Sequence, residues 1–99
     1  MKPEEYIKTF NINGKEIKLG LDDYGQSYFV EWEEDGKTRE TGLGTYNFNY
    51  MEAIYYMFDP RYKELSKRDM FGELTEKDWL EYCRYHDMFA EEYKKDETR

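Results

Sequence analysis

The 99-residue sequence contains one cysteine, one histidine and two prolines, and it has no long apolar run. Since Cys83 is the only cysteine, an internal disulfide is excluded, and a reduced, cytoplasmic setting is expected. Structural zinc sites usually take four Cys or His ligands, which Cys83 and His86 cannot supply. No stretch approaches the roughly 20 apolar residues that span a bilayer, so we expect no membrane segment.

Basic residues are outnumbered in this chain. There are 15 Lys and Arg against 23 Asp and Glu, which gives a formal net charge of −8. Direct binding to nucleic acid or to an anionic membrane requires cations, so both are disfavoured. The charge favours a basic partner protein, although surface acid also keeps proteins soluble without any binding role.

Aromatic residues are abundant, in contrast to the scarce cysteine. They make up 19% of the chain, with eleven tyrosines, while 38% of the residues are charged. Disordered chains share the high charge but lack the aromatics. Because Tyr and Trp bury large apolar areas, we expect one folded domain over residues 1–99 with a thin aromatic core. It comprises a sheet half, 1–44, and a helical half, 45–99.

Two turn signals predict a pair of β-hairpins in the sheet half. Asn13-Gly14 and Asp35-Gly36 each supply two residues that tolerate positive φ, as tight hairpin turns require. In the first hairpin the expected pairs are Ile12 with Lys15, Phe10 with Ile17, Lys8 with Leu19, and Tyr6 with Leu21. This register places one apolar set on a single face: Tyr6, Phe10, Ile12, Ile17, Leu19 and Leu21.

The second hairpin is expected to carry acid on its outward face. Its expected pairs are Trp32 with Arg39, Val30 with Thr41, and Tyr28 with Leu43. The residues that then face the core are Tyr28, Val30, Trp32 and Leu43. The opposite face holds Glu31, Glu33 and Glu40, with Phe29 at its edge, and the directly opposed Glu31 and Glu40 cost some stability.

Capping signals predict helices in residues 45–99. Asn49 begins the first helix, Asp59-Pro60 ends it and begins a second, and Thr75 caps the longest. An apolar stripe is expected on that last helix: Trp79, Tyr82, Cys83, His86, Phe89, Ala90 and Tyr93. The predicted fold is α+β of order ββββααα, a four-stranded antiparallel meander followed by two to three helices packed on one sheet face.

Short motifs between residues 28 and 57 resemble a known DNA-binding fold. They are "SYFVEW", the turn "DGK", "GTY", and "MEA" at the start of a helix. The stretch is similar to the AP2-type domains, a three-stranded sheet with a helix, found at the N-terminus of phage and transposon integrases. The resemblance implies a sheet that contacts the DNA major groove through Arg and Lys. This chain has Glu31, Glu33 and Glu40 instead, so DNA contact through the sheet is not expected.

The acidic sheet face favours imitation of nucleic acid. Strand residues two apart are separated by roughly 6.5 to 7 Å, near the spacing of successive phosphates. In size and composition the chain resembles small acidic phage and mobile-element proteins, including anti-CRISPR and anti-restriction proteins. This resemblance implies an inhibitor of a host defence nuclease such as a CRISPR effector. The expected partner-binding residues are Asp22, Asp23, Tyr24, Phe29, Glu31, Glu33, Glu34, Asp35, Glu40 and Tyr56.

No residue set in the sequence points to catalysis, a cofactor or a metal, so we expect no enzyme. Cys83 and His86 lie one helical turn apart on the apolar stripe, as core residues would. Two alternatives to an acidic inhibitor remain. The stripe would suit an oligomerisation module, and one basic cluster would suit a DNA-binding accessory protein: Arg61, Lys63, Lys67 and Arg68.

Overall fold

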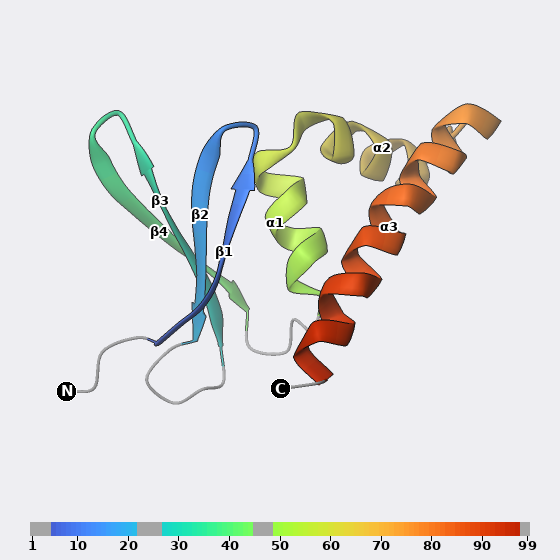
Figure 1. The fold of residues 1–99 in the computed structure, drawn as a ribbon. Helices are drawn as coiled ribbons and strands as arrows, with labels where there is room; N and C mark the ends of the chain where they lie inside the picture. The colour runs from blue at the N-terminus through green and yellow to red at the C-terminus, as the bar shows by residue number, and fades with distance from the viewer. Residues whose placement is uncertain (1–4, 22–26, 45–48, 98–99) are drawn as a thin grey trace. The chain divides into compact units, whose positions relative to one another are not determined.

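A computed structural model describes residues 5–21, 27–44 and 49–97 of the chain and has the predicted order ββββααα (Figure 1). One antiparallel sheet, ordered β1-β2-β3-β4, consists of β1 (Glu5–Ile12), β2 (Lys15–Leu21), β3 (Tyr28–Glu34) and β4 (Lys37–Gly44). The helices are α1 (Tyr50–Phe58), α2 (Pro60–Met70) and α3 (Glu76–Glu97). The α+β fold class is therefore confirmed.

The chain divides into two compact units, Met1–Ile54 and Tyr55–Arg99. The division falls inside α1, so the first turn of this helix belongs with the sheet and the rest belongs with α2 and α3. The expectation of a single domain over residues 1–99 stays a prediction. Within the described ranges, no helix combines the length and the apolar character that crossing a bilayer requires.

Both hairpin turns have the backbone conformation that their sequences predict. Asn13 and Gly14 have φ of 53° and 76°, and Asp35 and Gly36 have the same values. Two successive positive φ angles define the type I′ turn, whose twist matches that of the flanking strands. The strand pairs next to each turn are therefore in the expected register.

A β-bulge changes the register of the first hairpin away from its turn. The pairing shifts between Tyr6 and Lys8, so Tyr6 lies opposite Gly20 and the expected pair with Leu21 is wrong. A slip of one residue moves a side chain to the other face of the sheet. Tyr6 is accordingly 49% exposed rather than part of the core.

The second hairpin contains a similar irregularity. Its register shifts between Tyr28 and Phe29, so Tyr28 pairs with Gly44 and not with Leu43 as expected. The pairs nearer the turn, from Phe29 with Gly42 onwards, follow the expected alternation. From Val30 to the turn, each residue of β3 therefore lies on the face of the sheet that the sequence predicts for it.

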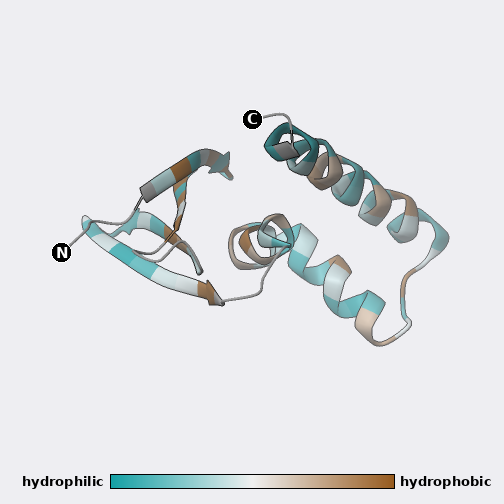
Figure 2. Cartoon of the chain, turned by 90° about the horizontal axis from the view of Figure 1, so that it is seen from below, coloured by the Kyte–Doolittle hydropathy of each residue, from teal (hydrophilic) through white to brown (hydrophobic). Residues whose placement is uncertain are grey.

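The sheet and the first turn of α1 enclose an apolar core. Hydrophobic residues stand among the hydrophilic ones along the strands (Figure 2). The ring of Tyr50 lies 5.2 Å from that of Tyr28, and its hydroxyl accepts a 2.8 Å hydrogen bond from the Lys8 ammonium. The buried apolar residues of this unit are Ile12, Ile17, Leu19, Phe29, Val30, Tyr50, Met51 and Ile54.

Side-chain and backbone caps fix both ends of α2. Asp59 accepts hydrogen bonds from the backbone N–H groups of Arg61 and Tyr62, at 3.0 and 3.2 Å. At the other end Gly72 has a φ of 69°, and the N–H of Glu73 donates back to the Arg68 carbonyl at 2.7 Å. This is a Schellman motif, which ends α2 after Met70.

The packed face of α3 differs from the predicted apolar stripe. Phe89 is 1% exposed, but Trp79 is 52% exposed and Ala90 is also exposed, so these two residues of the stripe lie outside the packed face. The packed face instead includes the carboxylate of Asp78 and the phenol of Tyr85. The packed face of α3 therefore combines Phe89 with polar groups that bond to α2 and to its N-cap Asp59.

We predict that Gly36→Ala destabilises the second hairpin by about 1–2 kcal/mol, because a Cβ atom strains a residue with positive φ. No neighbouring atom lies within 4 Å of the added carbon, so the cost is one of backbone conformation alone. Gly42→Ala is the matched control, since that glycine also has open space and does not have positive φ. Urea unfolding measures both, and an equal effect of the two substitutions would refute the turn assignment.

Candidate functional site

The face of the sheet that carries Glu31 is acidic, and we call it the outer face. Lys18 and Glu40 flank Glu31 directly on the neighbouring strands, and Glu33 pairs with Thr38 in the next row. Residues directly opposite each other in antiparallel strands share a face. The outer face of β2, β3 and β4 therefore has four glutamates against one lysine: Glu16, Glu31, Glu33 and Glu40 with Lys18.

Tyr6 is the exposed aromatic residue of the outer face. Its hydroxyl donates a 2.7 Å hydrogen bond to Oε1 of Glu31, and its ring lies 5.8 Å from that of Phe29. The ammonium of Lys18 lies 5.7 Å from the centre of the same ring. Tyr6 therefore holds Glu31 in place and adds an amphipathic ring to the acidic face.

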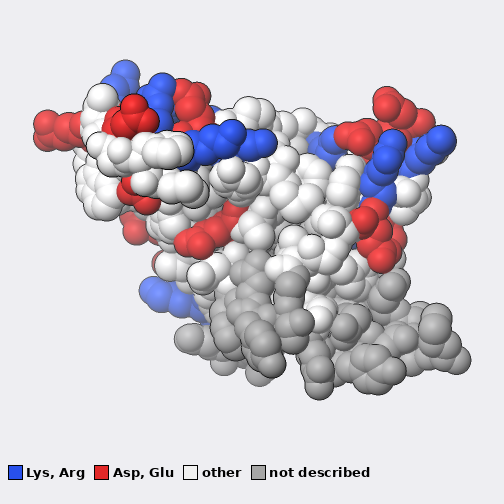
Figure 3. Space-filling model, turned by 180° about the vertical axis from the view of Figure 1, so that it is seen from behind, with Lys and Arg blue, Asp and Glu red and all other residues white. Residues whose placement is uncertain are grey.

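Glu34 lies on the other face, although it was expected to join the phosphate-imitating set. Its carboxylate is 3.5 Å from the Lys15 ammonium and 3.6 Å from Nε of Arg39. The alternation of β3 explains this, because Glu34 lies on the same face of the strand as Trp32, and Glu33 lies on the opposite face. At the hairpin tips basic and acidic side chains are consequently intermixed (Figure 3).

The other predicted contact residues have mixed outcomes. Asp35 is exposed at its turn, whereas Phe29 is only 6% exposed, and its role in partner binding stays a prediction. Tyr56 is half-buried beneath the Lys63 ammonium, 5.5 Å from the ring centre, and belongs to the helical unit. The remaining three, Asp22, Asp23 and Tyr24, lie outside the described residues.

A cleft separates the ends of the two hairpins. β2 and β3 pair only over four positions, from Leu21 with Tyr28 to Lys18 with Glu31. Beyond this point each hairpin continues to its own turn, and the two tips spread apart (Figure 1). The resulting cleft has a volume of about 500 Å³, and its lining residues are Asn13, Gly14, Lys15, Glu16, Lys18, Glu31, Trp32, Glu33 and Thr38.

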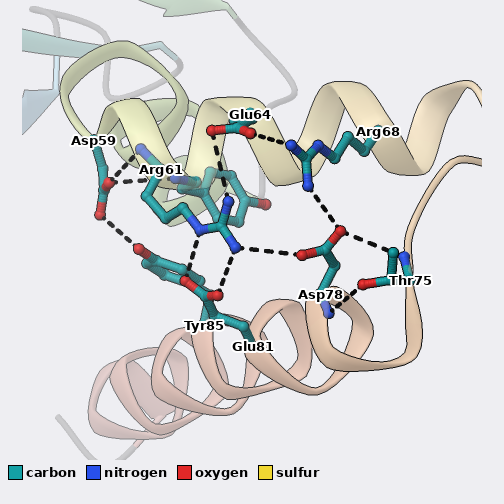
Figure 4. A network of polar contacts seen from close by, with 9 residues as sticks. Asp59, Arg61, Glu64, Arg68, Thr75, Asp78, Glu81 and Tyr85 are labelled. Carbon is teal, nitrogen blue, oxygen red and sulfur yellow. Dashed lines mark hydrogen bonds and ion pairs between the residues drawn. The ribbon is translucent and has the colours of Figure 1, made fainter.

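An ion-pair network joins α2 to α3 in the helical unit (Figure 4). Arg61 binds Glu81 through two hydrogen bonds of 2.9 and 2.8 Å. The carboxylate of Asp78 forms ion pairs with the guanidinium groups of Arg61, at 3.3 Å, and of Arg68, at 2.8 Å. Glu64 pairs with both arginines from within α2. Planar guanidinium groups suit such two-point contacts, so the network fixes the pairing of the helices.

Asp78 is the centre of this network and also caps α3. Its side chain accepts a hydrogen bond from the Thr75 backbone N–H, and the Thr75 hydroxyl accepts one from the Asp78 N–H. Burial alone would raise the pKa of Asp78, but the bonds from Arg68 and Thr75 outweigh it and lower that pKa. The hydrogen bond from Arg61 likewise lowers the pKa of Glu81.

We predict that acid weakens the helical unit. Carboxyls with lowered pKa values stabilise the fold above their ordinary pKa values, here 3.8 for Asp78 and 4.5 for Glu81, and this stability is lost as the pH falls below them. Urea unfolding followed by circular dichroism should need less urea as the pH falls from about 5 to about 3. Asp78→Asn, which cannot titrate there, should reduce this dependence. An unchanged dependence would show that the network does not stabilise the fold.

The basic cluster predicted from sequence is largely engaged within the protein. Arg61 and Arg68 form the ion pairs to α3. The Lys63 ammonium lies over the Tyr56 ring, and Lys67 is exposed. Two of the four cations that a phosphate-binding surface would use therefore stabilise the helix pair instead.

Aromatic rings surround His86 and Phe89 in the helical unit. His86 Nε2 lies 3.2 Å from the Tyr62 hydroxyl, and its ring packs edge-on against Tyr82 at 4.6 Å. Burial, together with a 3.1 Å hydrogen bond to Asp59, raises the pKa of Tyr85 to about 12. In the described parts of the chain, no group of three or more His, Cys, Asp or Glu side chains could hold a metal ion.

Sequence reasoning missed two parts of the outer face. The apolar alternation predicts Tyr6 in the core, since no local signal marks the bulge after it, and the predicted contact residues do not include Glu16. The alternation of β2 could have identified Glu16, because it flanks Ile17 and shares the face of Lys18. The cleft could not be anticipated, since no local signal marks where the β2–β3 pairing ends.

Comparisons with protein families, with characterised proteins and with solved structures find no match to this chain.

Proposed function

We propose that this chain is an acidic interaction protein which occupies a basic, nucleic-acid-binding surface of a partner, such as a host defence nuclease. The observation that carries the proposal is the outer face, where three glutamates of the second hairpin stand in two adjacent rows: Glu31, Glu33 and Glu40. Carboxylates two residues apart along a strand are separated by roughly 6.5 to 7 Å, which suits cations that otherwise bind successive phosphates.

Tyr6 supports the proposal because it combines exposure with a fixed position. Tyrosine presents a large contact area at low conformational cost, and it is enriched in protein interfaces. Here the hydrogen bond to Glu31 and the contact with Phe29 hold the ring on the acidic face. The outer face thus offers charge for steering and one aromatic residue for contact.

Capture from a host-cell lysate tests the proposal. The immobilised protein should retain a basic protein equally well before and after nuclease treatment, because nucleic acid is not the bridge. A double-stranded oligonucleotide should release the captured protein, because the oligonucleotide and the immobilised protein compete for the same basic surface. Retention that depends on nucleic acid, or a captured protein that the oligonucleotide does not displace, would contradict the proposal.

An oligomerisation module is the second candidate, favoured by exposed apolar side chains in the helical unit. Met70 and Phe71 are each 72% exposed at the end of α2, and Trp79 and Leu80 are 52% and 57% exposed on α3. Burial of such residues favours self-association. Light scattering over a range of concentrations distinguishes a monomer from a stable oligomer.

A further inference from the structure

Lys18 lies among the glutamates of the outer face, yet its ammonium contacts an aromatic ring. Lys18 is the direct partner of Glu31 across β2 and β3, a position at which opposite charges ordinarily attract each other. Among the described residues, however, no ion pair joins the Lys18 ammonium to a carboxylate. The ammonium lies 5.7 Å from the centre of the Tyr6 ring instead, so this ring already accepts a cation within the protein.

The carboxylate of Glu31 is held beside this ring with one oxygen open. Its Oε1 accepts the 2.7 Å hydrogen bond from the Tyr6 hydroxyl, whereas in the described part of the chain no donor reaches its Oε2. The Tyr6 ring is 49% exposed, and its edge-to-face contact with the buried Phe29, at 5.8 Å, supports it from one side. Tyr6 and Glu31 therefore present an aromatic ring and an open carboxylate oxygen next to each other.

A ring and a carboxylate in this arrangement suit a single cationic side chain. A lysine or arginine over a tyrosine ring is attracted by the ring, and it can donate a charge-assisted hydrogen bond to an adjacent carboxylate. Lys18 makes the first contact and not the second. Because Lys18 is exposed, its contact with the ring changes an equilibrium constant only roughly two- to fivefold. A cation that makes both contacts can therefore displace it.

We propose that Tyr6 and Glu31 bind a lysine or arginine side chain of the partner, and that Lys18 occupies the ring in the free protein and leaves it on binding. The proposal rests on the proposed function and deepens it, because it names the group of the basic partner that the outer face recognises. It also assigns Lys18 as an internal competitor for that group. Lys18 thereby lowers the affinity of the outer face, since its charge opposes the incoming cation.

Replacing Lys18 by methionine tests the proposal, because methionine is also unbranched but carries no charge. Lys18→Met should bind the captured partner at least about threefold more tightly, since the competing contact with the ring is lost. Lys37→Met is the matched control, because Lys37 is exposed beside the second turn and its loss changes the net charge equally. The control should change the affinity less than about twofold, since only long-range steering is altered.

Tyr6→Leu separates competition for the ring from a general effect of charge. It removes the ring and keeps an apolar side chain at a half-exposed position. In this background Lys18→Met should improve binding no more than Lys37→Met does, because the two cations no longer compete for a ring. Equal gains from Lys18→Met and Lys37→Met in the original protein, or the same gain from Lys18→Met with and without the ring, would overturn the proposal.

Peptide probes make the test independent of the captured protein. Triarginine amide and trilysine amide are titrated separately while nuclear magnetic resonance follows the backbone amide signals of Tyr6, Lys18 and Glu31. We expect saturable shifts with at least one peptide, and at least about threefold tighter binding to Lys18→Met. Absence of saturable shifts with both peptides would refute the proposal. If a peptide binds here while lysate capture fails, the proposed function fails alone. If capture succeeds and Lys18→Met gives no gain, only the present proposal fails.

Discussion

Truncating Phe89 to alanine is expected to lower the free energy of unfolding of the helical unit by about 3–5 kcal/mol. The ring is 1% exposed and contacts Tyr55, Tyr62 and Tyr85 at centroid distances of 5.0, 5.3 and 6.3 Å. Its removal takes away apolar contact and leaves a cavity that rigid aromatic neighbours fill poorly. In a protein of 99 residues this is a large part of the total stability.

Leu80→Ala on the same helix is the control, because Leu80 is 57% exposed. Its cost should be below about 1 kcal/mol, as for surface substitutions that open no cavity. Urea unfolding followed by far-ultraviolet circular dichroism measures both variants. Equal costs for Phe89→Ala and Leu80→Ala would show that Phe89 is not central to the packing of α3.

Reversing charge at Glu31, Glu33 and Glu40 together to lysine is expected to weaken partner binding at least a hundredfold, about 2.8 kcal/mol. The substitutions remove three carboxylates and place three cations opposite a basic surface. Like-charge contacts across an interface slow association and oppose binding. The hydrogen bond from Tyr6 to Glu31 is also lost, which frees the aromatic ring.

The matched control reverses three exposed acids of the helical unit, Glu73, Asp87 and Glu91, to lysine. This variant has the same net charge as the outer-face variant. It should bind the captured partner within a few-fold of the original protein, because only long-range steering changes. Comparable losses for the two variants, measured by surface-based binding kinetics, would mean that total charge matters and the outer face does not.

The elements that local chemistry determines could be predicted from the sequence. Asn13-Gly14 and Asp35-Gly36 specify type I′ turns without reference to the rest of the chain. Asp59 and Thr75 supply helix caps whose partners are two or three residues away. The alternation beside the second turn correctly placed three outer-face glutamates together: Glu31, Glu33 and Glu40.

The features that depend on tertiary contacts were not predictable. The bulge beside Lys8 leaves no mark on the sequence, because Tyr6 continues the apolar alternation of its strand. The packed face of α3 differs from the predicted one, because the apolar pattern predicts that Trp79 packs and that Asp78 is exposed. The arginines of α2, 10 and 17 residues before Asp78 in the chain, make Asp78 the packed residue.

Displacement of nucleic acid from the captured partner tests the central claim most directly. Fluorescence anisotropy would follow a labelled oligonucleotide on the purified partner while this protein is added. The account predicts full release by the original protein and by the helical-unit control, and no release by the variant with lysine at Glu31, Glu33 and Glu40. Equal release by that variant, or a stable ternary complex with the oligonucleotide still bound, would contradict the account.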